Sequence, residues 1–289
     1  MNLTDINEIH ALLDRHKFRF SKSMGQNFLT AAWVPEDIAA SALLDRDTAV
    51  LEVGPGIGCL TRELSMRAGK VVSVELDRAL QPILAETLSG CENVEVVFGD
   101  VLKQDIPALM RELAPGMRCA VCANLPYNVT SPLLTAFIEA DCFDSVTVMI
   151  QREVAKRICS GPGTADYGAF GIFVQWYMDT ELLFDVPPSC FIPQPKVTSS
   201  VIRLRRREKH PAEVEDEELM FRIIRAAFNQ RRKTLVNAVS SQVREVTKEE
   251  MEGILTKLGF DTRIRGEVLD IGSFAKISNE ISSVRNELL

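Results

Sequence analysis

The sequence has no long apolar run and few of the residues that build metal or disulfide sites. In its 289 residues, no stretch approaches the roughly 18 apolar residues of a membrane-spanning helix. Residues 1–5 also lack the basic and then apolar layout of a signal peptide. We therefore expect a cytoplasmic protein that makes no contact with a membrane.

Histidine is rare, and cysteine occurs in no pattern typical of a metal site. Cys119 and Cys122 have zinc-like spacing, but there is no second cysteine pair, and all three histidines lie far away in the sequence. Small buried residues on a central strand are the simpler explanation for the pair. Seven cysteines, an odd number, favour reduced thiols over a disulfide framework. We expect no metal.

The most informative stretch that is present is residues 50–58, VLEVGPGIG. Its unbroken aliphatic start suits a strand that is covered on both faces of a parallel sheet. Gly54, Gly56 and Gly58 then permit a sharp turn and a close approach to a ligand, and a helix is predicted from Cys59 to Ala68. A strand, a glycine turn and a helix together form the cofactor crevice of a doubly wound sheet.

Two cofactors are compatible with this crevice, a dinucleotide and S-adenosylmethionine. Glu75 ends the next predicted strand, where it would bind ribose hydroxyls of either one. The glycine spacing, however, is Gly-x-Gly-x-Gly rather than the dinucleotide form Gly-x-Gly-x-x-Gly. Carboxylates near the predicted strand ends would repel a pyrophosphate but attract a sulfonium and an ammonium group. These carboxylates are Glu52, Glu75, Asp77 and Asp100. We expect S-adenosylmethionine.

A later strand, predicted from Cys119 to Ala123, runs into Asn124-Leu-Pro-Tyr127. The Asn-x-Pro-Tyr motif is typical of enzymes that methylate exocyclic amines of nucleobases. With this motif the chain resembles the rRNA adenine N6-dimethyltransferases, most closely the bacterial small-subunit enzymes. The resemblance rests on seven ordered motifs: GQNFL at 25–29, EVGPGIG at 52–58, VELD at 74–77, GD at 99–100, NLPYN at 124–128, FIPQPKV at 191–197 and FNQRRKTL at 228–235.

The expected fold has an α/β domain followed by a helical one. Five apolar runs alternate with helical segments between residues 50 and 150, which indicates a parallel sheet with right-handed crossovers. Residues 181–186 and 200–205 are predicted to form a final hairpin. The resemblance implies a class I methyltransferase, which has a Rossmann-like, doubly wound, seven-stranded sheet with an antiparallel last strand.

Composition changes after Arg207, and this change sets the expected domain boundaries. The methyltransferase domain is expected over residues 1–207, with a helix and a basic cofactor-capping loop in residues 1–29. A charged linker follows at 208–218. A small all-helical domain that binds RNA is expected over 219–289, with helices at 219–228, 233–243 and 249–258 and short helices beyond.

The predicted chemistry follows from the weakness of an exocyclic adenine amine as a nucleophile, because its lone pair is delocalised into the ring. The Asn124 side-chain carbonyl and a backbone carbonyl near Leu125 or Pro126 would accept its two hydrogens and aim the lone pair at the methyl donor. Tyr127 would stack on a base taken out of its helix, and Phe191 is a candidate for its other face. Anchoring of the proline-rich loop is a nearly equal alternative for Phe191. We expect no general base.

The expected cofactor contacts come partly from the motifs and partly from the resemblance. The resemblance implies contacts from Asn27 and Leu29, although Phe28 and Leu29 also suit the role of core anchors for their loop. The complete expected set is Asn27, Leu29, Glu52, Gly54, Gly56, Glu75, Leu76, Asp100, Val101 and Asn124.

Positive charge is outnumbered by negative charge overall but is clustered locally. The 33 Lys and Arg against 40 Asp and Glu give a net charge of −7, which argues against a nucleic-acid-binding protein. Three basic clusters exist nonetheless, at 17–22, at 203–207 and at 222–233. A solvated face explains any one of them, but three beside a base-modifying motif favour a phosphate-binding surface. The expected RNA contacts are Lys22, Arg225, Arg231, Arg232 and Lys233.

The resemblance also implies a substrate, two adjacent adenosines in the 3′-terminal hairpin of 16S rRNA. They would be dimethylated by a monomer acting on a partly assembled small subunit. Alternatives are a large-subunit rRNA methyltransferase of the macrolide-resistance type, a DNA adenine methyltransferase, and a factor that acts mainly as a checkpoint in ribosome assembly. The segment at 228–235 resembles the small-subunit enzymes rather than the resistance enzymes.

Overall fold

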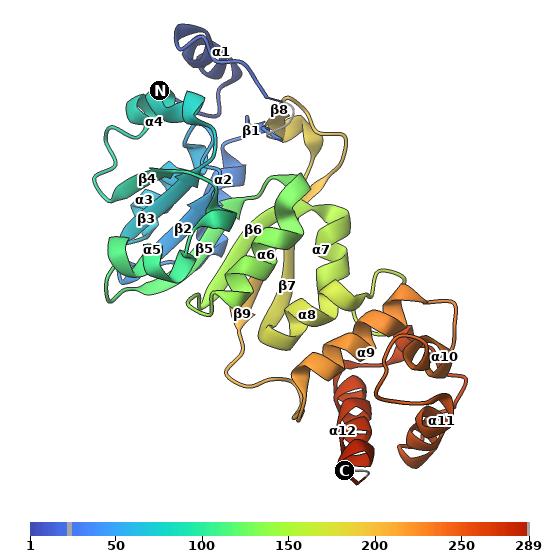
Figure 1. The fold of residues 1–289 in the computed structure, drawn as a ribbon. Helices are drawn as coiled ribbons and strands as arrows, with labels where there is room; N and C mark the ends of the chain where they lie inside the picture. Colours follow the sequence, from blue (N-terminus) through green and yellow to red (C-terminus); the bar gives the residue numbers. More distant parts are fainter. Residues whose placement is uncertain (22–24, 288–289) are drawn as a thin grey trace. The chain divides into compact units, whose positions relative to one another are not determined.

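The computed structural model describes residues 1–21 and 25–287, and the chain divides into two compact units (Figure 1). The first unit contains Met1–Ala155 and Asp179–Arg206, and the second contains Lys156–Met178 and Arg207–Leu289. The division after Arg206 lies next to the expected boundary. Residues 156–178, expected in the methyltransferase domain, belong instead to the second unit, because Tyr167 and Trp176 are buried in its hydrophobic core.

A seven-stranded sheet with the order β4-β3-β2-β5-β6-β9-β7 forms the centre of the first unit (Figure 1). Its strands are β2 (Thr48–Val53), β3 (Lys70–Glu75), β4 (Val94–Phe98), β5 (Arg118–Asn124), β6 (Ser145–Gln151), β7 (Met178–Val186) and β9 (Ser199–Arg206). β2 through β6 pair in parallel, whereas β9 runs antiparallel to β6. The fold is therefore the predicted class I methyltransferase fold, with the strand order reversing between β2 and β5.

The burial of β2 fits its place as an interior strand, third in the order of this sheet. All six of its residues are buried, as a strand covered on both faces requires. The helices of the first unit are α1 (Ile6–Arg15), α2 (Trp33–Ser41), α3 (Cys59–Arg67), α4 (Gln81–Thr87), α5 (Ile106–Leu113) and α6 (Thr130–Glu139), with α7 (Arg152–Cys159) at the division. α3 directly follows the glycine turn, so its N-terminus lies at the switch point of the sheet.

The N-terminal segment differs from its prediction in one respect. Asp5 caps α1, since its side chain accepts from the backbone N–H groups of Asn7 and Glu8. The basic stretch after it was expected to be a loop without a strand, but β1 (Phe28–Leu29) pairs antiparallel with β8 (Phe191–Ile192). Both residues of β1 are buried, which favours pairing over exposure of an apolar pair.

The second unit contains α8 (Ala169–Tyr177), α9 (Glu217–Asn229), α10 (Leu235–Ser240), α11 (Lys248–Lys257) and α12 (Ile271–Glu287). Three of these are close to their predicted positions. α12, however, is a single helix of 17 residues, where only short helices were expected. Ala275, Ile277 and Ile281 are buried in the core of this unit, so tertiary packing supports a helix with a polar outer face.

The expected linker over residues 208–218 is held to the second unit by specific contacts. His210 stacks on Trp176, with 4.6 Å between ring centroids, and the Glu217 carboxylate accepts from the indole N–H of Trp176 at 3.0 Å. Asp216 caps α9 by accepting from the Leu219 N–H. Within the described residues, no helix combines the length and apolarity that crossing a membrane requires.

Candidate active site

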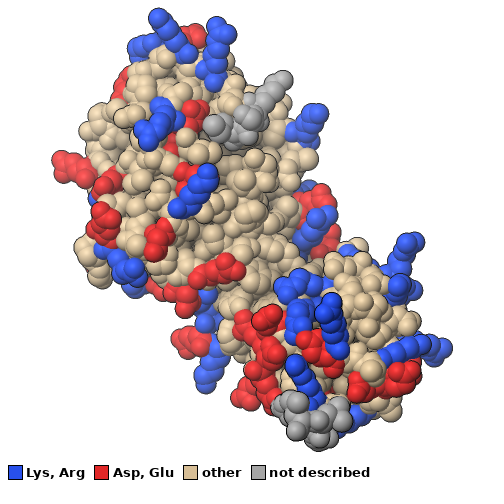
Figure 2. Space-filling view, viewed as in Figure 1, with Lys and Arg blue, Asp and Glu red and all other residues tan. Residues whose placement is uncertain are grey.

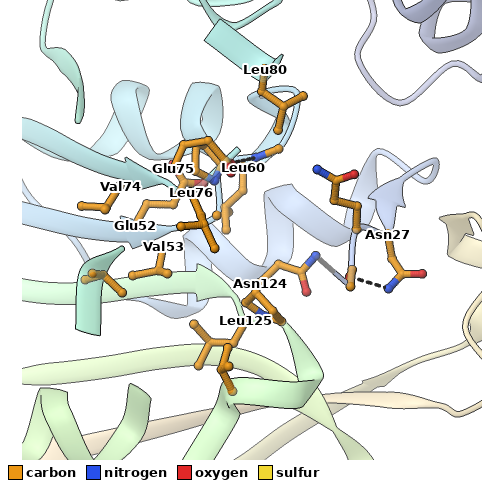
Figure 3. A pocket seen from close by; sticks show the side chains of 18 of the residues that line it. Asn27, Glu52, Val53, Leu60, Val74, Glu75, Leu76, Leu80, Asn124 and Leu125 are labelled. Carbon is orange, nitrogen blue, oxygen red and sulfur yellow. Dashed lines mark hydrogen bonds between the residues drawn. The ribbon is translucent and has the colours of Figure 1, made fainter. Parts of the chain in front are cut away.

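A pocket of about 240 Å³ opens at the carboxyl ends of β2, β3, β4 and β5 (Figure 3). Side chains from the ends of these strands meet there, because parallel strands present their carboxyl ends at one edge. The lining includes every residue expected to contact the cofactor, together with the four residues of the motif at 124–127. Residues far apart in the sequence are thus brought to one site.

The glycine turn between β2 and α3 forms one wall of the pocket. Gly54, Gly56 and Gly58 all have positive φ angles, of 71°, 60° and 91°, which residues with a Cβ atom rarely adopt. A Cβ atom added at Gly56 would lie 3.2 Å from the ring of Phe28. The turn therefore requires glycine for its conformation, and at Gly56 also for space.

Glu75 lies at the end of β3 and is held by backbone groups. Its Oε1 accepts from the Asp77 N–H at 2.8 Å, and its Oε2 accepts from the Gly56 N–H at 3.4 Å. Burial raises the pKa of this carboxyl above its ordinary value. Asp77, also expected among the acidic groups of the crevice, accepts instead from the Gln26 side chain at 2.7 Å, and thereby fixes the loop before β1.

Glu52, from β2, is the most deeply buried carboxyl group of the pocket, with 1% of its surface exposed. Its Oε2 accepts from both the Thr61 hydroxyl and the Ser73 hydroxyl, each at 2.7 Å. Burial raises its pKa to about 7, although both hydroxyls oppose the shift by favouring the charged form. This carboxyl therefore titrates near neutral pH.

Another part of the pocket lining combines a carboxylate with exposed apolar side chains. Asp100 follows β4 and accepts from the Leu102 N–H at 3.1 Å. Leu76 and Leu102 are 54% and 40% exposed, and both line the pocket. Sequence reasoning missed Leu102, together with Ile57 and Leu60. The signal for Leu102 was its place after a strand end, directly beyond Asp100 and Val101.

The turn at residues 124–127 presents acceptors toward the same pocket. The Pro126 carbonyl already accepts from the Val129 N–H at 3.3 Å and from the Thr130 hydroxyl at 3.2 Å. The Leu125 N–H donates to the Met149 carbonyl at 3.1 Å, but none of the described residues donates to the Leu125 carbonyl. Of the two candidate backbone acceptors, the Leu125 carbonyl is therefore the available one, beside the Asn124 side chain.

Comparison with known proteins agrees with this geometry. The family model described as ribosomal RNA adenine dimethylase matches residues 17–282. The chain belongs to this family. The ribosomal RNA small subunit methyltransferase A of Alkaliphilus metalliredigens is 46% identical over 274 residues, which cover 94% of this chain and 96% of that protein. The corresponding protein of Geobacillus kaustophilus is 46% identical over 275 residues, 94% of each chain.

Solved structures extend the comparison to more distant proteins. The 23S rRNA methyltransferase ErmE aligns with a TM-score of 0.69 and 28% identity, over 88% of this chain and 99% of that chain. A dimethyladenosine transferase from Plasmodium falciparum aligns with a TM-score of 0.72 over 88% of this chain and 97% of that chain. Its identity of 24% supports the fold alone.

Within this rRNA adenine dimethylase, Tyr127 and Phe191 lie in different surroundings. Tyr127 lines the pocket and is half-buried, and its hydroxyl shares a hydrogen bond with the Ser199 hydroxyl. Burial raises its pKa. Phe191 is 2% exposed, packs in the same core cluster as Leu29 and does not line the pocket. This position fits the alternative role, anchoring of its loop, and the stacking role of Phe191 stays a prediction.

The residues expected to contact RNA also divide into two kinds. Arg225, Arg232 and Lys233 are exposed, and within the described chain none of them forms an ion pair. Arg231 lies over the Phe228 ring at 5.7 Å and donates to the Ala165 carbonyl at 3.2 Å. Its guanidinium also lies 3.6 Å from Glu267, so Arg231 is engaged inside the second unit.

Two further expectations concern charge and metal. Lys22, the remaining expected RNA contact, lies outside the described residues. On the face that Figure 2 shows, basic and acidic side chains lie among one another rather than forming one continuous basic field. In the described part of the chain, no group of three or more His, Cys, Asp or Glu side chains is arranged to hold a metal ion.

Proposed function

We propose that this chain is an S-adenosylmethionine-dependent rRNA adenine N6,N6-dimethyltransferase that modifies two adjacent adenosines in the 3′-terminal hairpin of 16S rRNA. It would act in the cytoplasm, as a monomer, on a partly assembled small subunit. The observation that carries the proposal is the Asn124 to Tyr127 turn, which lines the glycine-turn pocket in a member of the rRNA adenine dimethylase family. Eight curated relatives named for the small subunit are 43–46% identical, whereas ErmE is 28% identical. This difference favours the small subunit.

The residues of the pocket fit S-adenosylmethionine, which supplies an electrophilic methyl group when bound. Glu75 provides a carboxylate, already oriented by two backbone N–H groups, that suits ribose hydroxyls. Leu76 and Leu102 offer apolar surface to a flat base, and Asp100 stands beside them as an acceptor for an exocyclic amine. The glycine turn leaves its backbone open to the remaining part of the ligand.

The target adenine is positioned by acceptors rather than by a base. The Asn124 side-chain oxygen and the Leu125 carbonyl accept the two N6 hydrogens, and the nitrogen lone pair then points away from the ring toward the methyl donor. Tyr127 supplies a face on which a base taken out of its helix stacks. No basic side chain is required, since the proton leaves to water once the nitrogen carries the new methyl group.

Affinity for the ribosomal precursor is assigned to the exposed cations of the second unit. Arg225, Arg232 and Lys233 have no acidic partner among the described residues, so each is available to a phosphate. Arg231 contributes by holding the segment around Ala165 and the end of α9 together. Phosphate contacts of this kind set position and affinity, while the pocket sets the reacting base.

The proposal is tested by methyl transfer from labelled S-adenosylmethionine to purified small and large ribosomal subunits from a strain that lacks the endogenous enzyme. We expect label in the small subunit, recovered as N6,N6-dimethyladenosine after digestion to nucleosides. Label in the large subunit alone would move the chain to the resistance type. Cofactor binding without any label would support an assembly factor instead.

A further inference from the structure

Glu52 is a carboxyl group of the pocket for which the reaction described above has no use. It is 1% exposed, and it lines the pocket. One oxygen, Oε2, accepts hydrogen bonds from the hydroxyls of both Thr61 and Ser73. None of the described residues donates to the other oxygen, Oε1. A carboxylate buried to this extent is costly when charged.

The groups that face Glu52 supply no positive charge. Thr61 and Cys59 come from α3, Ser73 and Glu75 come from β3, and Cys122 comes from β5. The Glu75 carboxylate repels negative charge at Glu52, and Glu52 in turn helps burial to raise the pKa of the Cys59 thiol to about 12. Two cations of α3, Arg62 and Arg67, act on Cys59 and Cys122, but neither is among the causes of the pKa shift at Glu52. A cationic ligand in the pocket would therefore favour the ionised form of Glu52 more than any of these groups does.

The proposed reaction changes the charge of one atom of the cofactor, its sulfur. When the methyl group moves to the adenine nitrogen, the carbon–sulfur bond breaks and its electron pair stays on sulfur, so a cationic sulfonium becomes a neutral thioether. A carbon–nitrogen bond forms, and the N6 proton leaves to water. The amino and carboxylate groups of the ligand are the same before and after transfer.

We propose that Glu52 makes the pocket prefer the cationic methyl donor to its neutral thioether product, by being ionised in the donor complex and protonated in the product complex. The inference rests on the proposed use of S-adenosylmethionine. Dimethylation of one nitrogen needs a fresh donor between the two transfers, so a pocket that weakens its hold on the product after each transfer favours the second one. The pKa of about 7 places the titration of Glu52 within the physiological range.

The test is equilibrium binding of S-adenosylmethionine and of S-adenosylhomocysteine to the full chain as a function of pH. The ratio of the two dissociation constants is the informative quantity, because the shared amino and carboxylate groups titrate alike in both ligands. We expect the preference for the donor to rise about fivefold between about pH 6 and about pH 8, and to approach tenfold over the whole titration, as one pKa unit of coupling implies. In Glu52→Gln the same ratio is expected to change less than about twofold.

A second variant separates Glu52 from Glu75, which also lines the pocket and has a raised pKa. Ser73→Ala removes one hydrogen bond to the ionised Glu52, so the midpoint of the pH dependence is expected to move to higher pH. Proton release on donor binding, measured by calorimetry in two buffers of different ionisation enthalpy, is expected in the wild type and lost in Glu52→Gln.

The outcomes distinguish this inference from the function on which it rests. If neither ligand binds the wild-type chain, the proposed function fails. If both ligands bind and their ratio is flat across pH, only the role of Glu52 fails. An unchanged pH dependence in Glu52→Gln, or an unmoved midpoint in Ser73→Ala, would likewise overturn it and point to Glu75.

Discussion

The pocket of the first unit and the exposed cations of the second unit hold their functional groups in opposite ways. In the pocket, Glu75 and Tyr127 are fixed by hydrogen bonds to neighbouring strands and turns. Arg232 and Lys233 are exposed, and no ion pair restrains them within the described chain. The difference follows from the task, because transfer to a weak nucleophile depends on position, whereas attraction of phosphates depends on charge.

The largest effect is expected from a change to the positioned group itself. Asn124→Ala removes the side-chain acceptor for one N6 hydrogen, and we expect kcat for methyl transfer to fall about a thousandfold, which is the upper range for loss of one preorganised group. Cofactor affinity is expected to fall while remaining measurable, since Asn124 is one of many lining residues. Single-turnover transfer at saturating cofactor measures the first, and equilibrium binding measures the second.

Asn128→Ala is the matched control for this substitution. Asn128 is an exposed asparagine in the same turn and does not line the pocket, so its loss is expected to leave kcat within about twofold. Equal loss in the two variants would assign the effect of Asn124→Ala to a disturbed turn rather than to a missing acceptor.

Substitutions of Phe191 test whether this side chain stacks on the substrate or only packs in the core. Phe191→Ala is expected to lower the free energy of unfolding by about 3 kcal/mol, as for other buried aromatics, whereas Phe191→Leu is expected to lower it by about 1 kcal/mol. The leucine variant keeps an apolar anchor but has no aromatic face, so we expect it to retain methyl transfer. Denaturant unfolding measures the loss of stability, and kcat measures whether methyl transfer is retained. If Phe191→Leu is stable but inactive, that result would support the stacking role of Phe191.

The sequence was sufficient to predict the pocket because of how a parallel sheet is built. Glu75, Asp100 and Asn124 each come directly at or after a predicted strand, and parallel strands bring such ends together. Their assignment therefore needed only the strands and their order. The carbonyl of Leu125 could not be separated from that of Pro126 in the same way, because the choice depends on donors from Val129 and Thr130.

Features that depend on distant partners were not predictable in this way. Phe28 and Leu29 pair with Phe191 and Ile192, and a strand of two residues shows no periodicity. In the sequence, Arg231 cannot be distinguished from the other cations of its basic run, because nothing near it indicates Glu267 as its partner. Tertiary packing likewise assigns residues 156–178 to the second unit, although they precede the last strands of the sheet.

Substitutions in the basic cluster test whether binding to the ribosomal precursor depends on charge that is not held in a fixed position. Replacing Arg232 and Lys233 by Ala is expected to weaken binding to the ribosomal precursor about tenfold at low salt and to reduce the slope of log K against log salt by about 1.5. Cofactor binding should stay unchanged. Lys248 and Lys276, two exposed lysines of the same unit, give a control with the same loss of charge. An equal loss in the control would mean that the cluster has no special part in RNA binding.

Arg231→Ala sharpens this test, because the groups that Arg231 contacts all belong to the second unit. We expect a loss of about 1 kcal/mol in the stability of the chain, from the contacts to Glu267, the Ala165 carbonyl and the Phe228 ring. The salt slope of RNA binding is expected to change less than in the double variant. A change in slope without a change in stability would show that Arg231 meets a phosphate after all.

The smallest effect is expected from loss of the Tyr127 hydroxyl. This change distinguishes a role of the ring face from a role of the hydroxyl at its edge. Tyr127→Phe keeps the face and loses the hydrogen bond to Ser199, so stability is expected to fall by about 1 kcal/mol while kcat changes less than about threefold. Ser199→Ala, which removes the same bond from the other side, should match it in both measurements. A far larger loss of kcat in Tyr127→Phe than in Ser199→Ala would mean that the hydroxyl itself reaches the substrate, and that the pocket positions the target adenine by the edge of the ring as well as by its face.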